Sequence, residues 1–262
     1  MKLAGSLGGA LLALGIAGVA SGDPMLVALT RSGALLVFAA DRPEAATRIP
    51  VHGVAGMLIG IDLRPADQQL YGVSTTNEIY RIDPKSGEAA SVSSLTVPFD
   101  GGNRSGIDFN PQADRLRLVS AEGQNLRVNA EIGATASDRP LSYAPGDPNA
   151  GRRPGIAASA YTHSLPGAAT TKLFNIDAAR DVLTVQDPPN DGVQRTVGPL
   201  GVDFAPEAGF EIVSLPSGEE RAYAATGGAL YAIDLASGAA TKLGPIGPGG
   251  DPVISLAAAG SD

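Results

Sequence analysis

The sequence predicts an all-β fold, a five-bladed β-propeller built from four-stranded antiparallel blades. A pattern of four short strands recurs with a period of roughly 48 residues, within the range of propeller repeats. Glycine and proline are frequent, at 34 and 20 residues, which is typical of many short strands joined by turns. One repeat is split between the two ends of the pattern, as in a ring that closes on itself.

Four complete copies of the repeat can be traced, each with an apolar first strand and a polar turn after its third strand. The first copy has the predicted strands Leu58–Leu63, Gln69–Ser74, Glu78–Ile82 and Ala89–Leu95. The second has Ser105–Phe109, Arg115–Ser120, Asn125–Asn129 and a fourth strand near Leu141–Tyr143. The third has Ala157–His163, Lys172–Ile176, Val182–Gln186 and Gln194–Val197, and the fourth has Phe210–Leu215, Arg221–Ala225, Ala229–Ile233 and Thr241–Leu243.

The fifth blade is predicted from two separate segments. The strands Leu26–Thr30, Ala34–Phe38 and Thr47–Val51 lack an innermost partner, and the apolar segment Val253–Ala259 has no repeat of its own to join. Pairing of the last strand with the first blade removes the open sheet edges that the ring would otherwise leave. The turn acids Asp83, Asp187 and Asp234 are expected to bond backbone N–H groups two residues on.

Composition limits the function classes. The formal charge of −8 and the lack of a basic cluster argue against nucleic-acid binding. The absence of cysteine excludes disulfides and thiolate chemistry. We expect a monomer whose partner is a glycan, a small molecule or a protein.

The first 22 residues differ in kind from the rest. Lys2 is followed by an uncharged apolar run and then by small residues, the pattern of a secretory signal peptide. An uncleaved membrane anchor is the alternative. We therefore expect residues 1–22 to be a signal peptide and residues 23–262 to form the propeller, secreted to the periplasm or the extracellular space with no stable membrane span after cleavage.

Several segments carry a family resemblance that covers nearly all of the chain after residue 22. They are Gly106-Ile107-Asp108-Phe109-Asn110-Pro111, Asp114-Arg115-Leu116-Arg117, Gly123-Gln124-Asn125-Leu126-Arg127, Tyr143-Ala144-Pro145-Gly146-Asp147-Pro148-Asn149-Ala150-Gly151, Ala160-Tyr161-Thr162, Asp187-Pro188-Pro189-Asn190-Asp191-Gly192 and Val197-Gly198-Pro199-Leu200-Gly201-Val202-Asp203. Together they resemble a family of bacterial secreted propellers, the domain of unknown function 4394. The resemblance implies a propeller fold and export, and it points to no particular activity. One departure is His163, where an amide is expected.

The innermost strands carry the first candidate site. Aligned on Asp108, the matching positions are Asp62, Tyr161, Glu211 and Ser255, which would ring the axis. Crowded acids repel one another, so they share a proton or a cation. Asp62, Asp108 and Glu211 therefore suit a structural role in the turns, a Ca²⁺ site, or a pair of catalytic carboxyls.

The insertion Ala134–Gly155 carries the second candidate site, because long loops in compact domains are usually functional or disordered. With the neighbouring inner strand it offers residues suited to a sugar or a protein partner: Tyr143, Asp147, Asn149, Arg152, Tyr161 and His163. Nearby charges are expected to form a buried ion network in preference to a ligand clamp, its members being Arg115, Arg117 and Arg127 with Asp108 and Asp114.

Two functions stay open at this stage. The first is an exported, non-catalytic binding or scaffold propeller that requires no cofactor, with a structural calcium ion as an option. The second is a hydrolase, glycoside hydrolase-like or lactonase-like, that uses Asp62, Asp108 and Glu211. No nucleophile-elbow or phosphate-binding motif favours another enzyme class.

Overall fold

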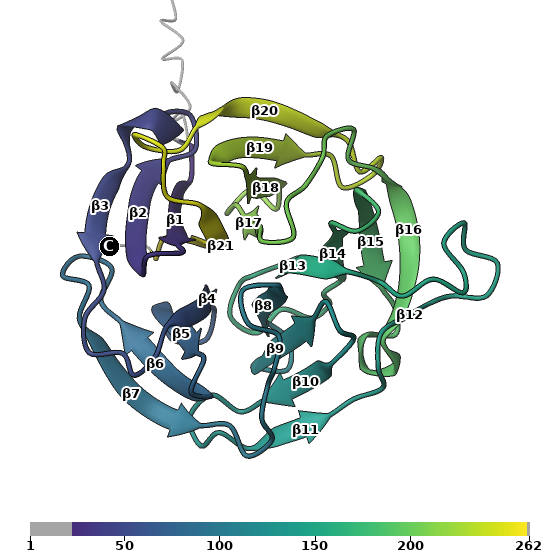
Figure 1. Cartoon of the computed structure of the whole chain (residues 1–262), viewed down its shortest axis with the longest axis horizontal. Helices are drawn as coiled ribbons and strands as arrows, with labels where there is room; N and C mark the ends of the chain where they lie inside the picture. The colour runs from purple at the N-terminus through teal and green to yellow at the C-terminus, as the bar shows by residue number, and fades with distance from the viewer. Residues whose placement is uncertain (1–22, 261–262) are drawn as a thin grey trace, which may run out of the picture.

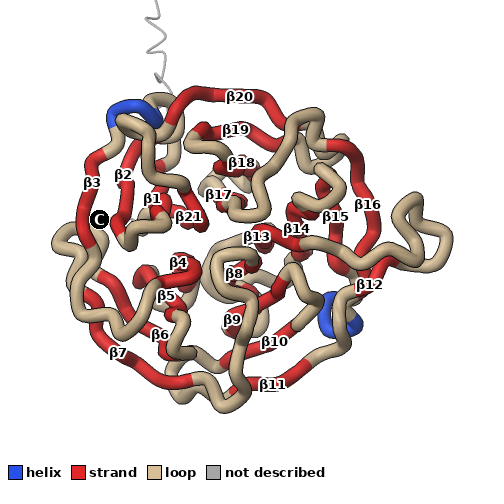
Figure 2. The backbone as a smooth tube through the Cα atoms, in the orientation of Figure 1, coloured by secondary structure: helices blue, strands red, loops and turns tan. Residues whose placement is uncertain are grey.

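The computed structural model describes residues 23–260, so the signal-peptide prediction lies outside the described residues. Within these described residues, twenty-one strands form five sheets arranged radially around one axis (Figure 1). The tube in Figure 2 shows the same ring, in which turns and loops join the strands. The predicted five-bladed propeller is confirmed.

The first blade is assembled from the two separate segments, as predicted. It consists of β21 (Val253–Ala258), β1 (Met25–Thr30), β2 (Ala34–Ala39) and β3 (Thr47–Pro50), in that order from the axis outward. β21 pairs antiparallel with β1, from Leu26 opposite Ala258 to Thr30 opposite Val253. Closure of the ring by the late strand is therefore confirmed.

The other blades follow one another along the chain, each from its inner to its outer strand. Blade 2 contains β4 (Leu58–Arg64), β5 (Gln69–Ser74), β6 (Glu78–Ile82) and β7 (Ala89–Ser94), and blade 3 contains β8 (Ser105–Asn110), β9 (Arg115–Ser120), β10 (Asn125–Val128) and β11 (Thr135–Ser137). Blade 4 contains β13 (Ile156–Tyr161), β14 (Leu173–Asp177), β15 (Val182–Gln186), β16 (Val193–Pro199) and the added β12 (Ser142–Tyr143). Blade 5 contains β17 (Gly209–Ser214), β18 (Glu220–Thr226), β19 (Ala229–Ile233) and β20 (Ala240–Pro245).

The predicted fourth strand of blade 3, near Leu141–Tyr143, is wrong. That strand is β11, whose residues pair with β10 through a short turn in which Gly133 has a φ of 69°. β12 instead runs parallel to β16 and extends blade 4. β11 carries polar or small, largely exposed residues and is held by backbone pairing, so it lacks an apolar pattern.

Side chains between neighbouring blades form the core, and four of the five interfaces are mainly apolar. The interface between blades 3 and 4 differs, because its apolar cluster contains only Val119, Leu141 and Ile156 among the described residues. Buried polar side chains fill the rest of that space, including Arg117, Asn175 and Gln194. Hydrogen bonds satisfy them within the interface, which makes burial of polar groups tolerable.

Two of the three turn acids act as predicted. Asp83 accepts a hydrogen bond from the Lys85 N–H at 2.8 Å, and Asp234 accepts one from the Ala236 N–H at 2.8 Å. Asp187 precedes a cis-proline and has its backbone N–H bonded to Val193, so its turn has a different form. Two short 3-10 turns, η1 (Pro43–Ala45) and η2 (Pro189–Asp191), interrupt the loops.

The antiparallel order gives the ring two distinct ends. Links between consecutive blades, and the hairpin between the second and third strand of each blade, lie at one end, which we call the link face. The other two hairpins of blades 2 to 5, and the hairpin between β2 and β3 in blade 1, lie at the opposite end, the hairpin face. Between residues 23 and 260, no helix has the length and apolar character needed to cross a membrane.

Candidate functional site

Three buried carboxyls converge from the inner strands of different blades. Asp62 is on β4, Asp108 on β8 and Glu211 on β17, and one oxygen of each lies within 4.8 Å of the others. Their exposed fractions are 5%, 2% and 2%. The structure thus brings together the three acids that the sequence alignment placed at equivalent positions. We call them the axial carboxyls.

Each axial carboxyl accepts a hydrogen bond from the backbone of the next inner strand in the ring. Asp62 Oδ2 accepts from the Phe109 N–H at 2.6 Å, and Asp108 Oδ1 accepts from the Tyr161 N–H at 3.2 Å. Glu211 Oε2 accepts from the Ala258 N–H at 3.1 Å. The acids therefore link blade 2 to blade 3, blade 3 to blade 4, and blade 5 to blade 1.

A glycine two residues before each acid lies on the same face of the strand and allows this close approach. The three motifs are Gly60-Ile61-Asp62, Gly106-Ile107-Asp108 and Gly209-Phe210-Glu211. A Cβ atom at Gly106 would lie 2.8 Å from the backbone nitrogen of Ser159, and one at Gly209 would lie 2.7 Å from that of Leu256. In each glycine-x-acid motif, the glycine thus lets the next inner strand pack closely, and the acid accepts a hydrogen bond from the backbone of that strand.

Tyr161 and Ser255 depart from the predicted ring. The Tyr161 N–H bonds Asp108 as the Phe109 N–H bonds Asp62, so Tyr161 corresponds to Phe109. The alignment that paired Tyr161 with Asp108 is wrong by one residue, and the Tyr161 hydroxyl accepts a 3.3 Å hydrogen bond from Arg117. Ser255 Oγ accepts from the Ile61 N–H at 3.1 Å and thereby links blade 1 to blade 2.

The surroundings of the axial carboxyls favour their protonated forms. Burial, reinforced by the charge of Glu211, raises the pKa of Asp62 well above its usual value. Burial and then the charges of Asp62 and Glu211 do the same to the pKa of Asp108. Burial raises the pKa of Glu211 to about 7, against the lowering effect of its backbone hydrogen bonds.

The donor set also fits a hard cation. Calcium takes oxygen ligands at about 2.3–2.6 Å, so ligands on opposite sides of the ion lie about 5 Å apart. The 4.8 Å limit on the oxygen separations falls within that span. A divalent ion would neutralise the mutual repulsion of the ionised acids, and water would supply further ligands.

The polar residues predicted to bind a ligand from the 134–155 loop are mostly engaged within the chain. The buried Tyr143 hydroxyl donates to Asp177 Oδ2 at 2.5 Å, and burial followed by this bond raises the tyrosine pKa. Asp147 accepts from the Thr196 N–H at 2.7 Å. Asn149 donates to Thr196 Oγ1 at 3.1 Å. These contacts hold the loop against β16.

The two remaining candidates, Arg152 and His163, are exposed. Arg152 lies in the loop, and its backbone N–H donates to the Asn149 carbonyl at 3.0 Å. His163 follows β13 with a φ of 56°, and its backbone N–H donates to Glu220 at 3.0 Å. A ligand role for these two residues stays a prediction.

The predicted ion network has different partners. Arg117 and Arg127 both pair with Asp138, at 2.6 and 2.7 Å, instead of with Asp108. Asp114 pairs with Arg64 of blade 2 at 2.6 Å. Asp108 is on the inner strand and its carboxyl bonds the neighbouring backbone, whereas the Arg117 side chain extends outward past Tyr161. The prediction of an Asp108 ion pair is therefore wrong.

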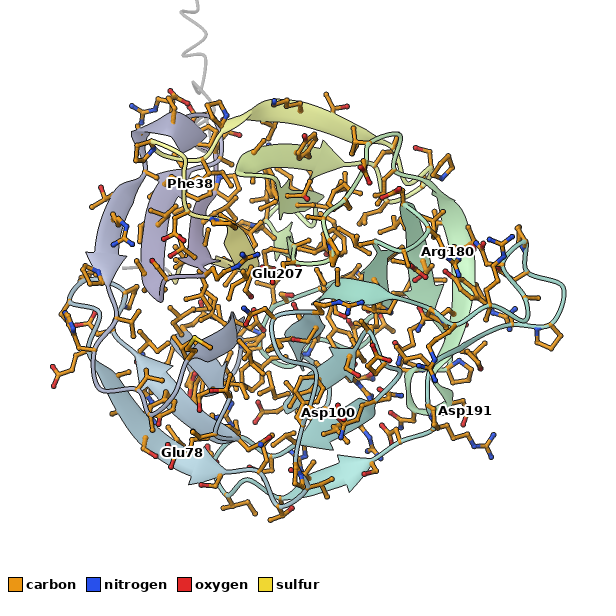
Figure 3. All side chains as sticks on the ribbon, in the orientation of Figure 1. Phe38, Glu78, Asp100, Arg180, Asp191 and Glu207 are labelled. Carbon is orange, nitrogen blue, oxygen red and sulfur yellow. The ribbon has the colours of Figure 1, made fainter. Side chains whose placement is uncertain are left out.

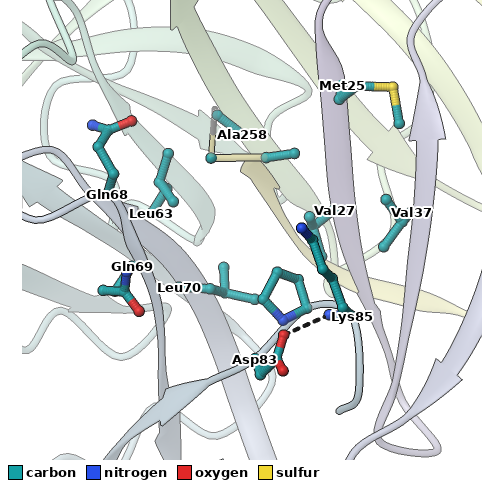
Figure 4. Close-up of a pocket in the computed structure, with 13 residues that line it drawn as sticks. Met25, Val27, Val37, Leu63, Gln68, Gln69, Leu70, Asp83, Lys85 and Ala258 are labelled. Atoms are coloured by element: carbon teal, nitrogen blue, oxygen red, sulfur yellow. Dashed lines mark hydrogen bonds between the residues drawn. The ribbon is translucent and has the colours of Figure 1, made fainter. Parts of the chain in front are cut away.

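An open pocket of about 420 Å³ lies on the hairpin face, between blades 1 and 2, where the ring closes (Figure 4). Its walls include Met25 and Val37 of blade 1, Gln68 and Asp83 of blade 2, and the end of β21 at Ala258. The axial carboxyls do not line it.

A family model for a domain of unknown function, DUF4394, matches residues 34–257. The chain belongs to the DUF4394 family. The match extends from β2 to β21 and so covers most of the ring. No curated protein matches the sequence.

The chain is similar to solved structures at low sequence identity. One, a structural genomics protein of unknown function from Bacteroides thetaiotaomicron VPI-5482, is 16% identical with a TM-score of 0.52. The match covers 89% of this chain and 61% of that one, so this chain spans about three fifths of its length. This similarity supports the fold alone.

Two further structures have TM-scores below 0.5. A protein of unknown function from Bacteroides caccae is 11% identical, with a TM-score of 0.43 over 84% of this chain and 72% of that one. An auxiliary nutrient binding protein from Bacteroides ovatus ATCC 8483 is 13% identical, with a TM-score of 0.46 over 76% of this chain and 55% of that one.

Proposed function

We propose that this chain is an exported, non-catalytic binding propeller whose axial carboxyls stabilise the ring around a calcium ion. The observation that carries the proposal is the double role of the glycine-x-acid motif. Each axial carboxyl is buried and bonds the backbone of the next blade. An acid with these contacts stabilises the ring, and its burial keeps it out of contact with a substrate.

Calcium is the cation that this set of ligands suits best. The three axial ligands are carboxylate oxygens, whereas zinc sites in proteins usually include histidine or cysteine. The two histidines, His52 and His163, are outside the cluster, and the chain has no cysteine. Treatment with EDTA is expected to lower the melting temperature at neutral pH, and added CaCl₂ to restore it. An unchanged melting temperature argues against a tightly bound ion.

The hydrolase alternative rests on one observation, the separation of the acids. Carboxyls about 5–5.5 Å apart serve retaining glycosidases, and the axial oxygens lie within 4.8 Å of one another. Their exposure of at most 5% opposes this function, because a glycosidic bond must pass between the two acids.

The test compares wild type with Asp108→Asn on p-nitrophenyl glycosides and aryl lactones. Asparagine keeps an oxygen that can accept from the Tyr161 N–H and removes the ionisable group, so the variant is expected to fold. We expect no turnover that depends on Asp108. Hydrolysis by wild type that disappears in a folded Asp108→Asn protein overturns the non-catalytic assignment.

A further inference from the structure

A second hollow opens at the centre of the link face, at the opposite end of the axis from the pocket in Figure 4. Its volume is about 590 Å³, within the usual range for small-molecule sites. Its main walls come from the β1–β2 and β18–β19 turns and from the links before β8, β17 and β21. We call it the mouth basin, and these wall residues are Arg31, Arg104, Pro206, Glu207, Gly227 and Pro252. Figure 3 shows Glu207 near the centre of the ring when the chain is viewed down its short axis.

Among the described residues, one cation of the mouth basin is paired and one has no partner. The Nε and Nη2 atoms of Arg31 both donate to Oε2 of Glu207. Arg104 is exposed, and its guanidinium makes no hydrogen bond or ion pair within residues 23–260. The basin therefore carries a net positive charge in a chain whose formal charge is −8.

Glu207 lines the same basin and also offers a hydrogen-bond acceptor. Its Oε1 atom accepts no hydrogen bond from the described part of the chain, since Arg31 uses Oε2 alone. The Glu207 side chain is 23% exposed. A free guanidinium and a free carboxylate oxygen on one basin suit a ligand that has a carboxylate and, next to it, hydroxyl groups that donate hydrogen bonds.

Backbone hydrogen bonds fix the two arginine segments before any ligand arrives. The Arg31 N–H donates to the Pro252 carbonyl at 2.8 Å and joins two walls of the basin. The Arg104 carbonyl accepts from the Ala121 N–H at 3.0 Å, which ties the link before β8 to blade 3. Because the basin is preformed, less of the binding free energy is lost in ordering its walls.

We infer that the mouth basin binds a hydroxy acid of monosaccharide size, with Arg104 pairing the carboxylate and Glu207 accepting from a hydroxyl. This inference rests on the proposed binding function and adds the chemical class of the ligand. It assigns no role to the axial carboxyls.

The experiment uses D-glucuronate as the probe, followed by amide chemical shifts in ¹⁵N-labelled protein. Glucose serves as the neutral analogue, and propionate as a carboxylate without hydroxyls. Arg104→Met removes the charge and keeps a long side chain. Arg42→Met is the matched control, because it removes the same charge from an exposed site outside the basin, in the loop after β2.

We expect glucuronate to shift the amides of Arg31, Glu207 and Gly227, and to bind more tightly than either analogue. Arg104→Met should weaken binding by at least about tenfold, the usual loss for one charge-assisted hydrogen bond, and Arg42→Met should not. Equal binding of glucose or propionate, absence of shifts at these amides, or equal effects of the two variants overturns the inference. Those results leave the proposed non-catalytic function intact, because that function is refuted by turnover that depends on Asp108.

Discussion

Removal of residues 253–262 should unfold the whole ring. The deletion takes away β21, in which Val253, Ile254 and Leu256 are at most 2% exposed. Full burial of such a side chain contributes about 1.5–3 kcal/mol, so the three together contribute about 5–9 kcal/mol. The deletion also removes the Ser255 link to blade 2 and the Ala258 N–H that bonds Glu211. The typical stability of a folded protein is about 5–15 kcal/mol, which makes this loss decisive.

Far-UV circular dichroism and urea titration measure the outcome. The truncated chain should show no cooperative transition, whereas Leu256→Ala should retain one with stability lowered by about 2–5 kcal/mol. A chain that ends at Ala259 is the control, because it keeps β21 and the Ala259 N–H bond to the Met25 carbonyl. A chain that ends at Pro252 and unfolds cooperatively near the wild-type urea midpoint refutes the assignment of β21 as the closing strand.

Two further predictions concern buried charge. In metal-free protein, stability should fall as the pH rises from 5 to 8, because the folded state holds protons on the axial carboxyls that the unfolded chain releases. Raising the pKa of Glu211 from 4.5 to about 7 corresponds to a loss of about 3 kcal/mol in the free energy of unfolding as the pH rises through this range. The Glu211→Gln variant should therefore show a flatter dependence of the urea midpoint on pH. A midpoint that rises over this range contradicts the pKa directions. Asp138→Ala should lower the free energy of unfolding by about 3–5 kcal/mol, because it leaves the charge of Arg117, which is 1% exposed, without its acidic partner. Thermal or urea unfolding measures this loss, and a value below about 1 kcal/mol contradicts that role.

The ring was predictable because its signals are local. Each blade repeats apolar strands and polar turns within roughly 50 residues, and the unpaired segments at the two ends of the pattern have one closure that leaves no open edge. The strand β11 was not predicted, because Thr135-Ala136-Ser137 lacks an apolar pattern. Its position depends on backbone pairing with β10, which the composition of the segment does not reveal.

The axial carboxyls were predictable from the alignment of inner strands, but their contacts were not. The glycine-x-acid motif is visible on three of the predicted innermost strands and would have placed Tyr161 correctly, since blade 4 has Ala158-Ser159-Ala160 in place of that motif. The partners of Arg64 and Arg117 lie 50 and 21 residues away along the chain. The pairing of Arg64 with Asp114 depends on the spacing between blades, which a repeat pattern leaves undetermined.

The role of the axial carboxyls is tested most directly by calorimetric titration of CaCl₂ into metal-free protein at pH 7.5. We predict one calcium ion per chain, with release of protons from the carboxyls as the ion binds. Asp108→Asn should abolish or strongly weaken this binding while the chain stays folded. A wild-type titration with no heat beyond dilution, or one that Asp108→Asn leaves unchanged, would contradict the proposal that these acids stabilise the ring around a calcium ion.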